Sequence, residues 1–149
     1  MRHTHRISRS LLLIALPALM LACGGSNEPS SSPYAGSYVA TSWTTTGNSG
    51  QQHPLVNGST LQITLAENGT TSGHLHFAGS GANPALDADM AGTWTVSGNV
   101  VDFTQAADTF VRDMLFTVSS NIQGITTLEG DHTFSGTQIQ ITLTRGGEI

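Results

Sequence analysis

The stretch that decides the fold is Ala91-Gly92-Thr93-Trp94-Thr95-Val96-Ser97-Gly98-Asn99-Val100-Val101-Asp102-Phe103-Thr104. On each side of its central Ser-Gly-Asn, apolar and polar residues alternate, so Trp94 and Val96 share one face of a strand. Val101 and Phe103 share a face of the returning strand in the same way. The Ser-Gly-Asn segment tolerates the positive φ angles that a tight hairpin turn requires. The pattern predicts two antiparallel strands with one buried face and one wet face.

The same pattern recurs along the chain and predicts six further strands, over residues 36–45, 60–66, 71–78, 115–119, 125–134 and 138–144. Most connections are tight turns, such as Glu67-Asn68-Gly69 and residues 121–124, whereas residues 47–58 and 79–87 are expected to be loops. Either parity of the first strand could face inward. Residues 105–114 could begin a helical turn or could cover one end of a barrel.

Eight short strands joined in sequence form a meander, and an open meander leaves two unpaired edges that closure into a barrel removes. Eight strands enclose an interior just wide enough for side chains or for one small ligand. We therefore predict an all-β fold, an eight-stranded antiparallel up-and-down barrel over residues 34–149, with a two-sheet sandwich as the alternative. A membrane-spanning barrel is disfavoured, because most of the strands are shorter than the roughly 9–11 residues of a tilted span.

The apolar faces of these strands define the expected barrel interior, which would be either core or ligand-binding surface. A cavity of roughly a few hundred Å³ would distinguish a ligand carrier from a barrel that is packed throughout. The expected interior residues are Leu61, Ile63, Leu65, Leu75, Phe77, Trp94, Val96, Val101, Phe103, Phe116, Val118, Ile139, Ile141 and Leu143.

The N-terminus has the layout of a secretory signal peptide. Arg2, Arg6 and Arg9 precede an apolar run over residues 11–22, which is short for a membrane span and ends in small residues. Met20-Leu21-Ala22-Cys23 resembles the bacterial lipobox. That resemblance implies that the cysteine is acylated and becomes the first residue of the mature protein.

Cys23 is the only cysteine, so no internal disulfide can form, and acylation would remove a lone thiol from an oxidising compartment. The residues that follow are rich in Gly, Ser and Pro and are expected to form a flexible tether. The expected organisation is a signal peptide (1–22), the lipidated cysteine with its tether (23–33) and the barrel domain (34–149). The lipobox resemblance, with Gly24 after the cysteine, also implies the outer membrane, facing the periplasm. An ordinary secretory signal with an incidental cysteine is the alternative.

Charge excludes one class of partner. The chain contains no lysine and five arginines, three of which lie in its first nine residues. Once the signal peptide is removed, two arginines face ten acidic residues, which gives a net charge of −8 with neutral histidines. A surface of this sign repels phosphate backbones, so we expect no nucleic-acid partner.

Candidate metal ligands are few. His74 and His76 are two residues apart on one strand, so both point away from its apolar face and are expected outside the barrel. Asp131-His132 could lie across the barrel, and Asp87-Ala88-Asp89 stands at a junction between loop and strand. Zinc needs three or four converging ligands, and calcium needs more oxygen ligands at set spacing. We therefore expect solvated histidines and strand-edge carboxylates, with no metal and no cofactor.

Catalytic motifs are missing from the sequence, which has no catalytic cysteine, Gly-x-Ser-x-Gly elbow or phosphate-cradling loop. We therefore expect a protein that is not an enzyme. Arg112-Asp113 is expected to form a local ion pair, although Arg112 at the barrel mouth could instead face a ligand carboxylate.

Three short motifs resemble those of the lipocalin-like (calycin) barrels. They are Gly36-Ser37-Tyr38 at the start of the first strand, the Gly-x-Trp of residues 92–94, and Arg145 at the end of the last strand. In those families, a Gly-x-aromatic motif on the first strand packs against a basic residue late in the chain and closes one end of the barrel. The resemblance implies a cation–π contact between Arg145 and either Tyr38 or Trp43.

These features lead us to expect a cell-envelope lipoprotein, anchored in the membrane through Cys23, whose barrel carries a small hydrophobic ligand. The alternative is a non-catalytic structural or protein-interaction lipoprotein with a fully packed barrel. The sequence does not identify a protein partner for either.

Replacing Cys23 by Ser should release the protein from membranes, because serine offers no thiol for the acyl chains. Fractionation of cells into soluble and membrane pools measures the effect. A Cys23→Ser variant that still sediments with membranes would contradict the predicted anchor.

Overall fold

Strands account for nearly all the regular structure in the computed structural model, which describes residues 32–80, 84–120 and 125–146. In chain order the elements are β1 (Gly36–Gly47), β2 (Gly50–Gln52), the 3-10 turn η1 (Pro54–Asn57), β3 (Thr60–Leu65), β4 (Thr70–Phe77), β5 (Leu86–Asp89), β6 (Gly92–Ser97), β7 (Val100–Gln105), β8 (Phe116–Ser120), β9 (Thr126–Phe134) and β10 (Thr137–Arg145). The predicted signal peptide, Cys23 and the predicted turn at 121–124 lie outside the described residues. Within the described part of the chain, no helix has the length and apolar character of a membrane span.

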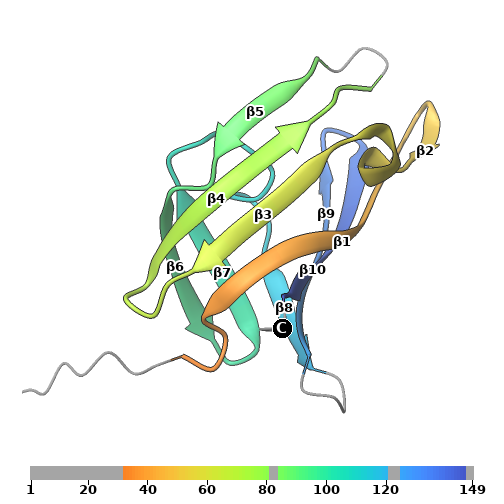
Figure 1. Cartoon of the computed structure of the whole chain (residues 1–149). Helices are drawn as coiled ribbons and strands as arrows, with labels where there is room; N and C mark the ends of the chain where they lie inside the picture. Colours follow the sequence, from red (N-terminus) through yellow and green to blue (C-terminus); the bar gives the residue numbers. More distant parts are fainter. Residues whose placement is uncertain (1–31, 81–83, 121–124, 147–149) are drawn as a thin grey trace, which may run out of the picture.

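Eight of these strands close into an antiparallel barrel (Figure 1). Neighbours around the barrel follow the chain in the order β1, β3, β4, β6, β7, β8, β9 and β10, and β10 pairs back onto β1. The two remaining strands are short, with β2 beside the far end of β1 and β5 beside β4. The predicted all-β up-and-down barrel is therefore confirmed, and its closure excludes the sandwich alternative.

The β6–β7 hairpin has the predicted register. Trp94 lies directly opposite Phe103, so both side chains share the inner face of the sheet. The indole Nε1 of Trp94 donates a 2.9 Å hydrogen bond to the carbonyl of Ala66. The rings of Phe103 and Phe116 meet edge to face, with centroids 5.3 Å apart. The hairpin is thereby fixed to both of its neighbours in the core.

A β-bulge in β1 settles which of its residues face inward. The register with β10 shifts between Ala40 and Ser42, which makes Thr41 an extra residue in β1. The bulge changes the inward parity, so Tyr38 and Trp43 are both buried, at 0% and 4% exposure, although simple alternation would place them on opposite faces.

Most of the residues expected inside the barrel are buried. Phe77, Val118 and Ile139 are only partly buried but pack against the core. The prediction for Val96 is wrong: it is 36% exposed, because it lies at the rim, one residue before the hairpin turn. Six core residues fall outside the predicted set, namely Tyr38, Trp43, Met90, Val111, Met114 and Leu128. The buried members of the predicted set are Leu61, Ile63, Leu65, Leu75, Trp94, Val101, Phe103, Phe116, Ile141 and Leu143.

One end of the barrel, which we call the Arg145 end, is closed by hydrogen bonds. Arg145 pairs with Tyr38 across β1 and β10, and its Nη1 donates to the carbonyls of Pro33 at 2.7 Å and Ala35 at 3.3 Å. Gly36 leaves room for the arginine, since a Cβ there would lie 2.7 Å from Arg145 Cδ. These bonds to backbone carbonyls replace the predicted cation–π contact. Burial raises the pKa of the Tyr38 phenol, and the neighbouring Arg145 opposes that rise.

Two connections differ from the loops predicted by the sequence, and a third shows which of two predicted structures residues 106–115 adopt. Residues 47–58 contain β2 and η1 rather than only a loop, and β5 begins inside the predicted loop of residues 79–87. Residues 106–115 form turns without an α-helix. Val111 and Met114 in that segment are buried and Phe110 packs against the core, so the segment covers the barrel interior.

Replacing Arg145 by Ala should lower the melting temperature by about 5–10 °C, because two carbonyls lose a charged donor worth about 2 kcal/mol in total. Thermal unfolding followed by circular dichroism measures the change. Arg112→Ala is the matched control, since Arg112 forms only exposed ion pairs of the kind that contribute little. Equal melting temperatures for the Arg145→Ala variant and the wild type would show that the Arg145 end closes without this side chain.

Candidate functional site

The barrel wall is incomplete at the end opposite Arg145, which we call the pocket end. β4 pairs with β6 only through Thr70 and Thr71, and β7 pairs with β8 only through Val100 and Val101. Beyond these pairs β4 lies against β5 instead (Figure 1). The short strands β6, β7 and β8 therefore wall only the half of the barrel nearer Arg145. Around the other half, β5 and residues 106–115 complete the wall.

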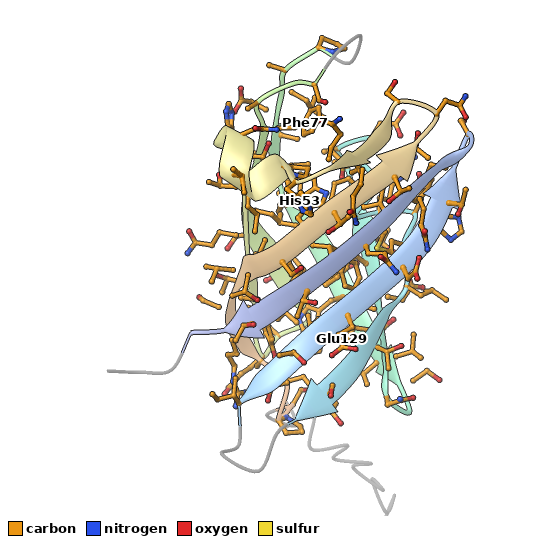
Figure 2. All side chains as sticks on the ribbon, turned by 90° about the vertical axis from the view of Figure 1, so that its right-hand side faces the viewer. His53, Phe77 and Glu129 are labelled. Atoms are coloured by element: carbon orange, nitrogen blue, oxygen red, sulfur yellow. The ribbon has the colours of Figure 1, made fainter. Side chains whose placement is uncertain are left out.

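A cavity of about 670 Å³ opens at the pocket end. Phe77, at the end of β4 and beside η1 in Figure 2, is part of its lining. The apolar lining consists of Trp43, Leu75, Phe77, Leu86, Phe110, Phe134 and Ile139. The polar lining is uncharged and consists of Thr45, Asn48, Ser49, Gln52, Ser80, Ser135 and Thr137, with Gly47 and Gly50.

Trp43 is the centre of the aromatic part of this wall. Its ring centroid lies 5.3 Å from that of Phe110 and 6.0 Å from that of Phe77, both in tilted contacts. The Nε1 of Trp43 is buried and has no hydrogen-bond acceptor among the described residues. An unsatisfied buried donor of this kind costs about 1–3 kcal/mol.

Only part of this site agrees with the sequence prediction. Of the residues expected inside, Leu75, Phe77 and Ile139 line the cavity, and the others lie in the packed core or, for Val96, at the far rim. Sequence reasoning missed Trp43, Leu86, Phe110 and Phe134 as lining residues. For Phe110 the available signal was an aromatic residue in an ambiguous stretch, because a large apolar side chain outside a regular strand still has to be covered.

Histidines and aspartates meet on the outside of β4 and β5. His74 Nε2 lies 3.1 Å and His76 Nδ1 lies 2.8 Å from the same carboxylate oxygen of Asp87. His74 Nδ1 also lies 3.5 Å from an oxygen of Asp89. The hydrogen bond with Asp87 raises the pKa of His74, and the bonds from His76 and then His74 lower the pKa of Asp87. The predicted outward histidines and edge carboxylates thus form one cluster that ties β5 to β4.

The described residues contain no group of three or more His, Cys, Asp or Glu side chains arranged to hold a metal ion. His132 packs against Phe134 with ring centroids 4.4 Å apart, rather than reaching across the barrel. Asp131 accepts hydrogen bonds from Gln138 and Gln140, which lower the pKa of its carboxyl group, with Gln140 the larger cause. The acidic residues of β9 belong to an outer depression of about 370 Å³ that includes Glu129 (Figure 2).

Arg112 forms the local ion pair that the sequence favours. Its Nη2 lies 2.6 Å from Asp108 Oδ1, and its Nε lies 3.0 Å from Asp113 Oδ1. These carboxylates raise the pKa of the guanidinium further, with the hydrogen bond to Asp113 as the largest cause. Arg112 does not belong to the cavity lining.

No protein-family model, curated protein or solved structure matches the chain. Within the described residues, the packed half and the hollow half of the barrel are distinct regions of one sheet, and the cavity of about 670 Å³ lies in the hollow half.

The cluster on β4 and β5 should make stability depend on pH in a defined window. A raised His74 pKa stabilises the fold below its ordinary value of 6.5, and this contribution is lost as pH rises through the folded pKa. A lowered Asp87 pKa stabilises above 3.8, and this contribution is lost as pH falls through the folded pKa. Replacing Asp87 by Asn should therefore lower the melting temperature most near pH 5 (about midway) and less near pH 8 or below about pH 3.

Melting curves of the Asp87→Asn variant and the wild type across this range measure the difference. Asp102→Asn is the control, because it removes one exposed charge from β7 instead. A difference that does not change with pH would show that the histidines and Asp87 are not coupled.

Proposed function

We propose that this protein is a lipid-anchored lipoprotein of the bacterial cell envelope whose lipocalin-like barrel carries a small hydrophobic ligand in the cavity at the pocket end. The observation that carries the proposal is the cavity of about 670 Å³, because its volume and aromatic lining match those of small-molecule sites. The lining is apolar where it meets the core, and polar around the loops at its mouth. Such a site suits a ligand with a hydrophobic body.

The proposed anchor fits the position of the cavity. Residue 32, the first described residue, lies at the Arg145 end, because Arg145 donates a hydrogen bond to the carbonyl of Pro33. A tether from Cys23 would therefore join the barrel at the end opposite the cavity. In the proposed outer-membrane lipoprotein, the cavity would then open away from the bilayer, toward the periplasm.

The second candidate function is a non-catalytic interaction protein with a barrel that holds no ligand. Dense packing near Arg145 favours it, since Tyr38, Ile63, Phe116, Leu128 and Leu143 are all completely buried there. Packing of this kind is what a purely structural barrel requires. The hollow pocket end favours the carrier, because a barrel that binds no ligand gains stability by filling such a space.

Filling the cavity should abolish binding. The test uses the full chain carrying Cys23→Ser, which avoids detergent, and titrates it with the neutral fluorescent probe N-phenyl-1-naphthylamine. A Thr45→Trp variant places a bulky side chain in the lining and should bind the probe at least about tenfold more weakly. Thr46→Trp is the matched control, because Thr46 is the next residue of β1, is exposed and does not line the cavity. It should bind like the parent chain.

Mass spectrometry of an organic extract of the native, membrane-purified protein complements the titration. A co-purified small hydrophobic molecule, reduced in the Thr45→Trp variant and retained in the Thr46→Trp variant, would support the carrier. A parent chain that neither binds the probe nor retains any such molecule would contradict it and leave the interaction protein.

A further inference from the structure

The cavity wall combines aromatic rings with neutral polar groups. Its deeper part contains the rings of Trp43, Phe77 and Phe110. Its mouth is bordered by the turn between β1 and β2, with Asn48 and Ser49, and by neutral hydroxyl and amide side chains. Among the described residues that line the cavity, none has a side chain that ionises near neutral pH. Recognition at this site must therefore proceed without an ion pair from its own wall.

Among the described residues, the arginines that might pair with a ligand are engaged elsewhere. The chain has no lysine. Arg145 is hydrogen-bonded at the opposite end of the barrel, and Arg112 is paired with Asp108 and Asp113. Residues 81–83 and 121–124, which the structure does not describe, read Gly-Ala-Asn and Asn-Ile-Gln-Gly and so have no ionisable side chain. Histidines do not compensate, since none of the described ones belongs to the lining.

The consequence for a charged ligand follows from desolvation. A carboxylate or phosphate that entered this cavity would lose water and gain no counter-ion, which is strongly unfavourable. The acidic chain, with a net charge of −5 including its N-terminus, also repels anions at a distance. An ammonium group would meet aromatic faces but no carboxylate in the described lining. A neutral hydroxyl or carbonyl group keeps its hydrogen bonds, because the mouth offers matching donors and acceptors.

We propose that the cavity selects uncharged amphiphiles, in which a ring or chain sits against the aromatic wall and a neutral, oxygen-bearing end lies among the polar groups of the mouth. Free fatty acids, lipid phosphates and amines are excluded as good ligands. The inference rests on the proposed function, since it names the ligand class of the same cavity.

A matched set of three compounds tests the selection. 2-Naphthalenemethanol, 2-naphthoate and 2-naphthylmethylamine share one apolar body and differ in the charge of the attached group. Each displaces N-phenyl-1-naphthylamine from the full Cys23→Ser chain at about pH 7.5, where the acid and the amine are charged. We expect the alcohol to bind at least about tenfold more tightly than either charged compound.

A pair of variants separates charge from shape. Thr45→Lys introduces a cation into the lining and should raise the affinity for 2-naphthoate at least about fivefold relative to the alcohol. Thr46→Lys adds the same charge on the outer face of β1 and should leave the order of affinities unchanged. If 2-naphthoate or the amine binds the parent chain as tightly as the alcohol, the charge selection is overturned while the carrier function stands. If neither the fluorescent probe nor any of the three compounds binds, the proposed function fails and this inference fails with it.

Discussion

The pairing of β10 with β1 is the constraint on which the rest of the structure depends. It extends from Tyr38 opposite Arg145 at one end to Thr46 opposite Gln138 at the other. Without it, the meander would expose the edges of its first and last strands, which is a state that invites association with other chains. With it, the inner faces of all eight strands converge on one core, and the chain's few charged residues stay outside. Closure also brings Arg145 to the residues that precede β1, which links the two ends of the domain.

The bulge at Thr41 gives this closing strand two different roles. Before the bulge, Tyr38 fills the closed end of the barrel, and after it, Trp43 faces the cavity. A strand of unbroken alternation would direct one of these aromatic side chains to solvent, because side chains on a strand alternate with period two. The extra residue therefore lets one strand contribute an aromatic side chain to both the packed half and the hollow half. The short strands β6, β7 and β8 complete the division, since they wall only the packed half.

Local patterns were enough to predict the barrel from the sequence. Alternation over residues 92–105 and the turn residues between them describe a unit whose partners are nearby in the chain, so its register was readable. The same logic identified most of the core. The side chains that this reasoning misplaced are those whose positions depend on contacts between segments distant in the sequence. Leu86 lines the cavity because β5 pairs with the C-terminal half of β4. The four residues of β5 are too few for an alternating pattern to predict that pairing. The position of Phe110 depends on the packing of an irregular segment. Val96 is exposed because a side chain that points inward at the rim of a barrel is not covered by other residues.

Charge is distributed in the barrel so that it shapes the cavity without entering it. Arg145 fixes one end, and Arg112 is paired with Asp108 and Asp113 on the exposed side of the segment from which Phe110 reaches the cavity wall. The wall itself, within the described residues, has no side chain that ionises near neutral pH, whereas on the outer face of the sheet the hydrogen bonds between His74 and Asp87 raise the pKa of the first and lower that of the second. The cavity proposed as the binding site and the His74–Asp87 cluster thus lie on opposite faces of the sheet. They meet in β5, where Leu86 lines the cavity from the strand that Asp87 ties to β4.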